Sequence, residues 1–311
     1  MRKIRVGITG ASGFIGRKLM THFIEQGHSV KVISRSSNKF FNHELLNVFE
    51  TDLTDPSPTL IKAFVEKVDV VYHLAAELND PSKILKTNVE GTQAIVDALE
   101  GTNTLLIHLS SIGVFDFSPT EVIHENSQKK TFNLYEESKL KAEMVIDNGR
   151  NSAGLKAVVL RPSIVLGNEM KSQLIKQLIR LLNSGIHLKI SEKVIANFVL
   201  ADDVVDALIF LASDKNAIGE SYNFSNDISL ATFLTLIRNH LPSQRKISFS
   251  GKIFTKFLWV GKWIGFLNIS YDGIRFFSNR KKIPTDKIEQ LGFQFNTNYS
   301  SFLKEYLTTY K

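Results

Sequence analysis

A glycine-rich turn near the N-terminus constrains the fold of this chain more than any other feature. Residues 1–8 alternate polar and apolar side chains as a buried first strand does, and residues 17–26 carry apolar side chains at helical spacing. Between them lie Gly10, Gly13 and Gly16. The glycines therefore belong to a turn that joins a strand to a helix.

The spacing of these glycines fits a phosphate-binding turn. Gly10 permits the tight turn, Gly13 lets the backbone approach a pyrophosphate, and Gly16 lets the helix pack against the strand. Backbone amides at the helix N-terminus then face the phosphates, where the helix dipole favours negative charge. Three glycines can also form a bare structural turn, but this placement favours a dinucleotide cofactor. The turn supplies three further expected cofactor contacts: Ser12, Phe14 and Ile15.

Strands and helices alternate through residue 160, which predicts a parallel sheet with helices on both faces. We expect an α/β fold in which residues 1–165 form a Rossmann-like, doubly wound parallel sheet that binds NAD(P). Residues 166–311 are expected to form mainly a smaller C-terminal substrate-binding lobe, with some segments returning to the sheet. A chain of 311 residues is long enough for both parts.

Composition limits the compartment and the cofactors. The chain has no cysteine, which excludes a disulfide framework, a thiol nucleophile and a cysteine metal site, and no metal site is predicted. No apolar run reaches the ~20 residues that span a bilayer, and the N-terminal residues lack the pattern of a signal peptide. We therefore expect a cytoplasmic protein.

The net charge of +7 is concentrated late in the chain, because residues 240–284 hold nine lysines and arginines and one acid. Such a region attracts phosphates, membranes or nucleic acid, but no nucleic-acid-binding motif is recognised. Arg275 and Arg280 are candidate contacts for a diphosphate, or else part of a solvated face. The aromatic segment 253–283 is interpreted as a packed lid helix, or alternatively as an interfacial helix that makes a peripheral membrane contact.

The end of the second predicted strand, residues 28–34, indicates which cofactor is bound. An acid at this position normally binds the adenosine ribose hydroxyls, but here the chain has Ser34, Arg35 and Ser36, with Lys39 close by. An arginine beside hydroxyl groups suits a 2′-phosphate. We therefore expect NADP to be preferred, with NAD as the alternative. The other interpretation of Arg35 is a solvated loop residue.

Three residues late in the sheet region suggest the chemistry. Tyr135 and Lys139 are four positions apart on a predicted helix and therefore share one face. A tyrosine of pKa ~10 is a poor base, and a neighbouring ammonium favours its phenolate. Ser111 can hydrogen-bond a substrate oxygen, so the three groups could polarise a carbonyl and transfer a proton while a nicotinamide transfers a hydride. His108 is interpreted as a core histidine with hydrogen-bonded ring nitrogens rather than as a catalytic base.

Together these motifs resemble the extended short-chain dehydrogenases/reductases of the NAD-dependent epimerase/dehydratase family. The resemblance implies that Ser111, Tyr135 and Lys139 form a catalytic triad. Where the family often has Val-Tyr-Gly, this chain departs with Val114, Phe115 and Asp116. The matching segments are 9–16, 52–53, 73–76, 88–92, 109–111, 135–139, 161–167 and 197–203, with a weaker match at 286–293.

The family resemblance also implies a set of cofactor contacts beyond the glycine turn and Arg35. Asp52 is expected to accept a hydrogen bond from the adenine amino group, although it could equally cap the next helix. The predicted strand over residues 68–76 ends in small residues, which let the backbone lie against the cofactor. The remaining expected contacts are Leu53, Leu74, Ala75, Ala76, Asn88, Tyr135, Lys139 and Pro162.

The pattern around residues 167–174 and 195–199 resembles the substrate lobe of bacterial sugar epimerases and reductases. We therefore expect an NAD(P)-dependent oxidoreductase or epimerase that reduces a 4-keto nucleotide sugar or epimerises one at C4. One alternative is a reductase of a hydrophobic ketone of steroid or flavonoid type. Another is a non-catalytic, NADP-sensing regulatory protein, against which the intact Ser-Tyr-Lys set argues. A homodimer is also expected.

Overall fold

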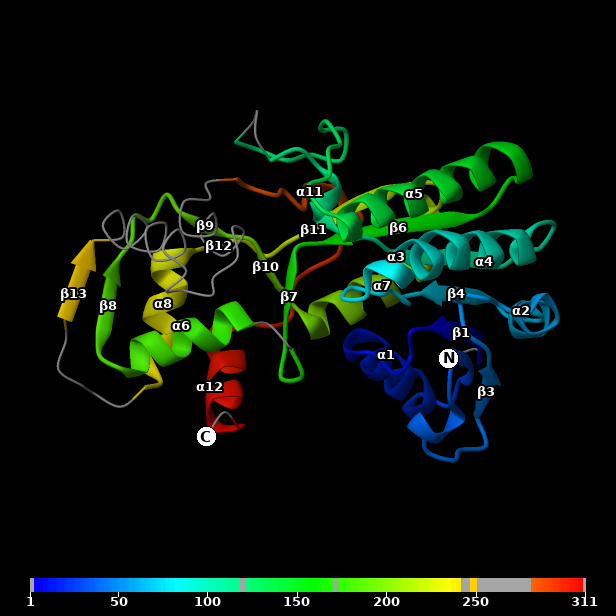
Figure 1. Ribbon diagram of the computed structural model, residues 1–311, viewed down its shortest axis with the longest axis horizontal. Helices are drawn as coiled ribbons and strands as arrows, with labels where there is room; N and C mark the ends of the chain where they lie inside the picture. Colours follow the sequence, from blue (N-terminus) through cyan, green and yellow to red (C-terminus); the bar gives the residue numbers. More distant parts are fainter. Residues whose placement is uncertain (1–2, 118–120, 171–172, 242–246, 251–280, 310–311) are drawn as a thin grey trace.

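The computed structural model describes residues 3–117, 121–170, 173–241, 247–250 and 281–309 (Figure 1). Its centre is a seven-stranded sheet in the order β11-β6-β5-β4-β1-β2-β3, in which every neighbouring pair is parallel. The strands are β1 (Arg5–Thr9), β2 (Ser29–Ser34), β3 (Leu46–Glu50), β4 (Val70–His73), β5 (Leu105–Leu109), β6 (Ala157–Pro162) and β11 (Ser221–Phe224).

Helices cover both faces of this sheet, which confirms the predicted Rossmann-like, doubly wound α/β fold. One face packs against α1 (Phe14–Glu25) and α7 (Ala201–Ser213), and the other packs against α2 (Pro58–Val65), α4 (Gly91–Leu99) and α5 (Leu134–Ala153). Continuous apolar runs such as Ala157–Leu160 of β6 arise because a strand buried on both faces has no polar side to present.

Residues 81–99 form three consecutive helical elements. Helix α3 (Pro81–Leu85) leads into a π-helical turn, η2 (Lys86–Glu90), and then into α4. Single π turns inside helices occur frequently at functional sites. Here the turn contains Asn88, whose side chain is buried.

A second, smaller lobe lies to one side of the sheet in Figure 1. Its core is formed by apolar side chains of three helices and of the short strands between them. These helices are α6 (Gln173–Asn183), α8 (Leu230–Asn239) and α12 (Tyr299–Thr309). The short strands of this part of the chain are β7 (Ile164–Leu166), β8 (Ile186–Lys189), β9 (Ile195–Ala196), β10 (Phe198–Leu200), β12 (Ile228–Ser229) and β13 (Ile247–Ser250).

The chain passes between the two parts several times. After the first lobe segment it returns to the sheet through α7 and β11, and later through α11 (Asp286–Glu289), which contacts β11. Arg275, Arg280 and most of the segment 253–283 lie outside the described residues. No described helix is both long and apolar enough to cross a membrane.

Candidate active site

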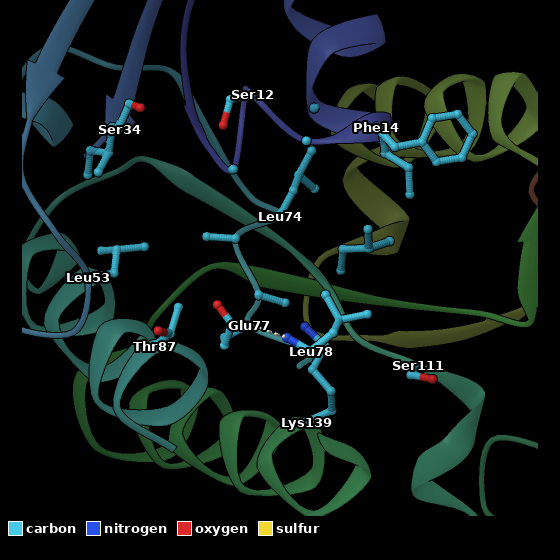
Figure 2. Close-up of a pocket in the computed structure, with 18 of the residues that line it drawn as sticks. Ser12, Phe14, Ser34, Leu53, Leu74, Glu77, Leu78, Thr87, Ser111 and Lys139 are labelled. Atoms are coloured by element: carbon cyan, nitrogen blue, oxygen red, sulfur yellow. Dashed lines mark hydrogen bonds between the residues drawn. The ribbon is translucent and has the colours of Figure 1, made fainter. Parts of the chain in front are cut away.

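A cavity of about 490 Å³ lies along the carboxyl ends of the central strands (Figure 2). This is the edge at which ligands bind in open, doubly wound sheets. The structure places nearly every expected cofactor and catalytic residue among the described chain on its wall. These residues are Gly10, Ser12, Gly13, Phe14, Ile15, Gly16, Arg35, Asp52, Leu53, Leu74, Ala75, Ala76, Ser111, Tyr135, Lys139 and Pro162.

The glycine turn forms a backbone cradle that has no room for side chains. Gly10 has φ +72°, and a Cβ atom there would lie 2.7 Å from the amide nitrogen of Ala75. A Cβ on Gly16 would collide with the carbonyl oxygen of Gly10, which already accepts a hydrogen bond from the amide of Gly13 at 2.9 Å. The bare turn at the start of α1 and the adjoining cavity therefore fit the diphosphate of a nicotinamide dinucleotide.

The end of β2 presents positive charge on the wall of the cavity. The Ser34 hydroxyl donates to the carbonyl of Ser36 at 3.0 Å and accepts from its amide at 3.3 Å, so it holds the turn. The exposed guanidinium of Arg35 has no ion pair or hydrogen bond within the part of the chain that the structure describes. Arg35 and Lys39 both line the cavity and are available to an anion.

Asp52 does not cap the following helix, which was the alternative interpretation of its role. Its carboxylate accepts from the amide of Thr54 at 3.0 Å, within its own turn, whereas the N-cap residue of α2 is Ser57. Because one carboxylate oxygen takes this bond, the other stays available on the cavity wall.

Asn88 is the exception among the described cofactor candidates, because it lies behind the cavity wall. Its side-chain oxygen accepts from the amide of Glu77 at 2.7 Å, and its nitrogen donates to the Glu77 carbonyl and to the Ser138 hydroxyl. Ser138 in turn donates to the carbonyl of Tyr135 at 2.6 Å. Asn88 therefore joins the loop after β4 to the helix that carries Tyr135.

Two adjacent serines follow β5, and their hydrogen bonds distinguish them. The Ser110 hydroxyl donates to buried Glu143 at 2.6 Å and has no second proton to give. The Ser111 oxygen accepts from the amide of Gly113 at 3.1 Å, which leaves its own proton free for another acceptor. Ser111 is therefore the serine that can donate to a bound oxygen.

Helix α5 brings Tyr135 and Lys139 to the wall of the same cavity as Ser111, and Figure 2 shows Lys139 and Ser111 there. The helix begins after Asn133, whose side chain accepts from the amide of Glu136 at 2.9 Å. Burial, and to a lesser extent the charge of Glu136, raises the pKa of Tyr135 to about 12. Burial lowers the pKa of Lys139 to about 8, against the opposing charge of Glu143.

These pKa values correct the expectation that Lys139 favours the phenolate in the protein alone. The helical spacing places the two residues on one face, as predicted, but burial of Tyr135 raises the pKa of its phenol. The hydroxyl is therefore protonated at neutral pH and is poised to donate a proton. Lys139 lies near the middle of its titration at mildly alkaline pH.

A buried cluster around Glu143 was not foreseen from the sequence. Its carboxylate receives two hydrogen bonds from Arg161, at 2.7 and 2.9 Å, and one from Lys129 at 2.8 Å. Burial tends to raise the pKa of Glu143, but the hydrogen bonds and charges of Arg161 and Lys129 hold it below its ordinary value. The cluster joins α5 to β5 and β6 one turn behind Lys139. The helical spacing Tyr135, Lys139, Glu143 was the available signal.

His73 is a second buried polar residue that joins neighbouring segments by hydrogen bonds. Its two ring nitrogens lie 2.7 Å from the Thr9 hydroxyl and 2.9 Å from the Thr92 hydroxyl. Thr92 donates its own proton to the carbonyl of Asn88, so the Nε2 of His73 must donate to Thr92 and its Nδ1 must accept from Thr9. Burial, and then the charge of Lys139, lower the pKa of His73 to about 3. The ring is neutral and fixed.

His108 lies in the core as predicted, but it is not satisfied. It is 1 % exposed, and neither ring nitrogen has a hydrogen-bond partner among the described residues. Its ring lies 5.3 Å from that of His73, centroid to centroid. Burial, followed by the charge of Lys139, lowers the pKa of His108 well below its usual value, so it is a neutral side chain rather than a base.

The comparisons with known proteins agree with this geometry. The model of the NAD dependent epimerase/dehydratase family matches residues 6–225. The human dTDP-D-glucose 4,6-dehydratase is 25% identical over 247 residues, which cover 73% of this chain and 70% of that protein. Dihydroflavonol 4-reductase of Arabidopsis thaliana is 26% identical over 273 residues, covering 78% and 70%.

Solved structures share the fold. The UDP-glucuronic acid 4-epimerase of Bacillus cereus in complex with NAD superposes with a TM-score of 0.73 at 17% identity. The match covers 98% of this chain and 97% of that one. At this identity the likeness establishes the architecture alone.

Proposed function

The chain is an enzyme that belongs to the NAD-dependent epimerase/dehydratase family, and from that premise we propose that it acts on a nucleotide sugar. The reaction is either reduction of a 4-keto sugar or epimerisation at C4. The observation that carries the proposed chemistry is the convergence of Ser111, Tyr135 and Lys139 on a cavity that the bare glycine turn also lines. Matching relatives whose names include a sugar-nucleotide dehydratase, and a fold neighbour named as a UDP-sugar epimerase, support the substrate class.

The proposed mechanism assigns one task to each side chain. A nicotinamide held by the glycine turn would supply the hydride acceptor or donor. The Ser111 proton binds the sugar oxygen and fixes it beside the Tyr135 phenol. Tyr135 donates its proton to that oxygen as a carbonyl is reduced, and recovers one when an alcohol is oxidised. Lys139, buried one helical turn away, places positive charge where the phenolate forms.

A hydrophobic ketone remains the second candidate substrate. It is favoured by the match to dihydroflavonol 4-reductase, which has the same level of identity as the sugar-nucleotide relative. The two candidates share the catalytic residues and differ in what the lobe must bind. Substrate assays therefore separate them better than cofactor assays do.

Incubation of the purified protein with UDP-linked sugars and 4-keto sugars, with and without added NADPH, is expected to yield a sugar product. Net reduction consumes the added cofactor, whereas epimerisation returns it to its starting state, so absorbance at the nicotinamide band assigns the reaction. Matched assays use a flavonoid and a steroid ketone. Turnover of those ketones with no action on any nucleotide sugar would contradict the proposed substrate class.

For the cofactor, we propose that NADP(H) is preferred to NAD(H), supported by the exposed Arg35 after β2, which has no ion pair within the described residues. Arg35→Asp is expected to reverse the preference, because a carboxylate repels the 2′-phosphate and accepts from the ribose hydroxyls. Fluorescence titration with NADPH and NADH gives both dissociation constants. Arg180→Asp, at an exposed arginine of α6 that lies outside this cavity, is the control. Tighter NADH binding by the unaltered protein would contradict the preference.

A cytoplasmic location, a homodimer and a peripheral membrane contact through 253–283 also belong to this proposal. Sedimentation of the purified protein tests the dimer. Flotation with vesicles that contain anionic lipid tests the membrane contact.

A further inference from the structure

Glu77 is fixed in the cavity wall by an unusual number of hydrogen bonds. Its Oε1 atom accepts from the amides of Leu78 at 3.1 Å, Asn79 at 2.9 Å and Asp80 at 3.2 Å. Asn88 holds its backbone from the other side, accepting from the Glu77 amide at 2.7 Å and donating to its carbonyl at 3.0 Å. The side chain therefore cannot swing out of the wall without breaking several bonds.

This carboxylate faces the cofactor cavity and carries charge. Glu77 lines the same cavity as Arg35, and in the view of Figure 2 it appears between Thr87 and Leu78. The hydrogen bond from Asn79 is the main cause that lowers the pKa of Glu77, and the positive charge of Arg35 acts in the same direction. All three amides bind Oε1, so the second oxygen, Oε2, has no hydrogen bond within the described chain.

A fixed negative charge in this position is unexpected for a site that must hold phosphates. A dinucleotide already brings a charged diphosphate, and the 2′-phosphorylated form adds about −1.5 to −2 charges more. Because the charge of Arg35 acts on Glu77 across the same cavity, a 2′-phosphate bound at Arg35 also lies within reach of the Glu77 carboxylate and is repelled by it. Glu77 and Arg35 thus act on cofactor choice in opposite directions.

We propose that Glu77 is a specificity-determining residue of the cofactor pocket, whose fixed carboxylate offsets Arg35 and limits the preference for the 2′-phosphorylated dinucleotide. This inference rests on the proposed cofactor chemistry. It assigns selectivity to the loop after β4 as well as to the end of β2. Three backbone amides hold the Glu77 carboxylate in one place, whereas a flexible surface acid could move away from a bound phosphate.

Glu77→Gln isolates the charge, because the amide oxygen of glutamine can still accept from the three backbone amides. Titration with NADPH and NADH by fluorescence is expected to show the ratio of their dissociation constants moving about 3- to 10-fold toward NADPH at low salt. The shift is expected to shrink at 1 M salt, where the Debye length is only about 3 Å and more distant charges are screened from each other. An unchanged melting temperature establishes that the loop is intact.

Glu90→Gln is the matched control, because Glu90 is exposed on the neighbouring π-helical turn and is not part of the cavity. It removes the same charge and is expected to leave the ratio within twofold. A Glu77→Gln ratio that stays within twofold, or that moves toward NADH, overturns the inference. A parallel Arg35→Ala titration tests the cofactor proposal separately: no loss of NADPH preference there refutes that proposal and leaves the Glu77 result interpretable.

Discussion

Tyr135→Phe is expected to lower turnover by about 10²-fold or more while changing cofactor binding by less than twofold. The change removes one hydroxyl from the wall of the cavity, and the loss of an acid–base group has this order of effect. The phenyl ring keeps the packing of the first turn of α5. Because burial raises the pKa of the Tyr135 phenol, it is protonated at neutral pH, and the change removes the proton that it would donate.

The measurement is steady-state turnover on the substrate identified by the UDP-sugar assay, beside titration of cofactor fluorescence. Tyr222→Phe provides a matched control, because Tyr222 is a buried tyrosine of β11 that lies outside the cavity. Its loss of a hydroxyl is expected to leave turnover nearly unchanged. Equal turnover of the Tyr135 variant and the unaltered enzyme would remove Tyr135 from the mechanism.

Glu143→Ala is expected to destabilise the protein by about 3–5 kcal/mol, the largest effect on stability that the described structure suggests. The change leaves the buried guanidinium of Arg161 without its counter-ion, and an unpaired buried charge has this cost. It also removes the acceptor of the Ser110 hydroxyl. The free energy of unfolding, measured in urea with cofactor absent, reports the loss.

The control for this change is Glu137→Ala on the same helix. Glu137 forms an i,i+4 ion pair with Lys141 at 2.7 Å, but both side chains are nearly half exposed. Exposed pairs contribute about 0–1 kcal/mol, so a small effect is expected. Replacing Glu143 and Arg161 together by methionine is expected to cost less than Glu143→Ala alone. Comparable losses from Glu143→Ala and Glu137→Ala would contradict the role assigned to the buried pair.

Local sequence patterns predicted the sheet and the position of the cavity because both depend on short-range features. A buried strand, a glycine turn and the next helix occupy adjacent residues, and parallel strands bring their ends to one edge. The same reasoning placed Ser111, Tyr135 and Lys139 on that edge. Helical spacing alone was enough to put Tyr135 and Lys139 on one face.

The rest depends on contacts between distant segments, which spacing does not encode. The bond between Ser110 and Glu143 joins residues 33 positions apart, and it decides which serine is free. The position of Asn88 behind the wall follows from a π-helical turn that apolar periodicity does not reveal. Burial, too, comes from packing, and it reversed the expected direction of the Tyr135 pKa.

The repeated passage of the chain between sheet and lobe has a consequence for synthesis. A nascent chain that has released only its first 165 residues lacks α7, which covers one face of the sheet beside α1, and β11, which pairs with the edge of β6. Such an intermediate exposes an apolar face of the sheet and leaves the outer side of β6 unpaired until residue 224 has emerged. The two parts therefore cannot mature one after the other on the ribosome: the cofactor-binding sheet is completed only after the first segments of the lobe exist.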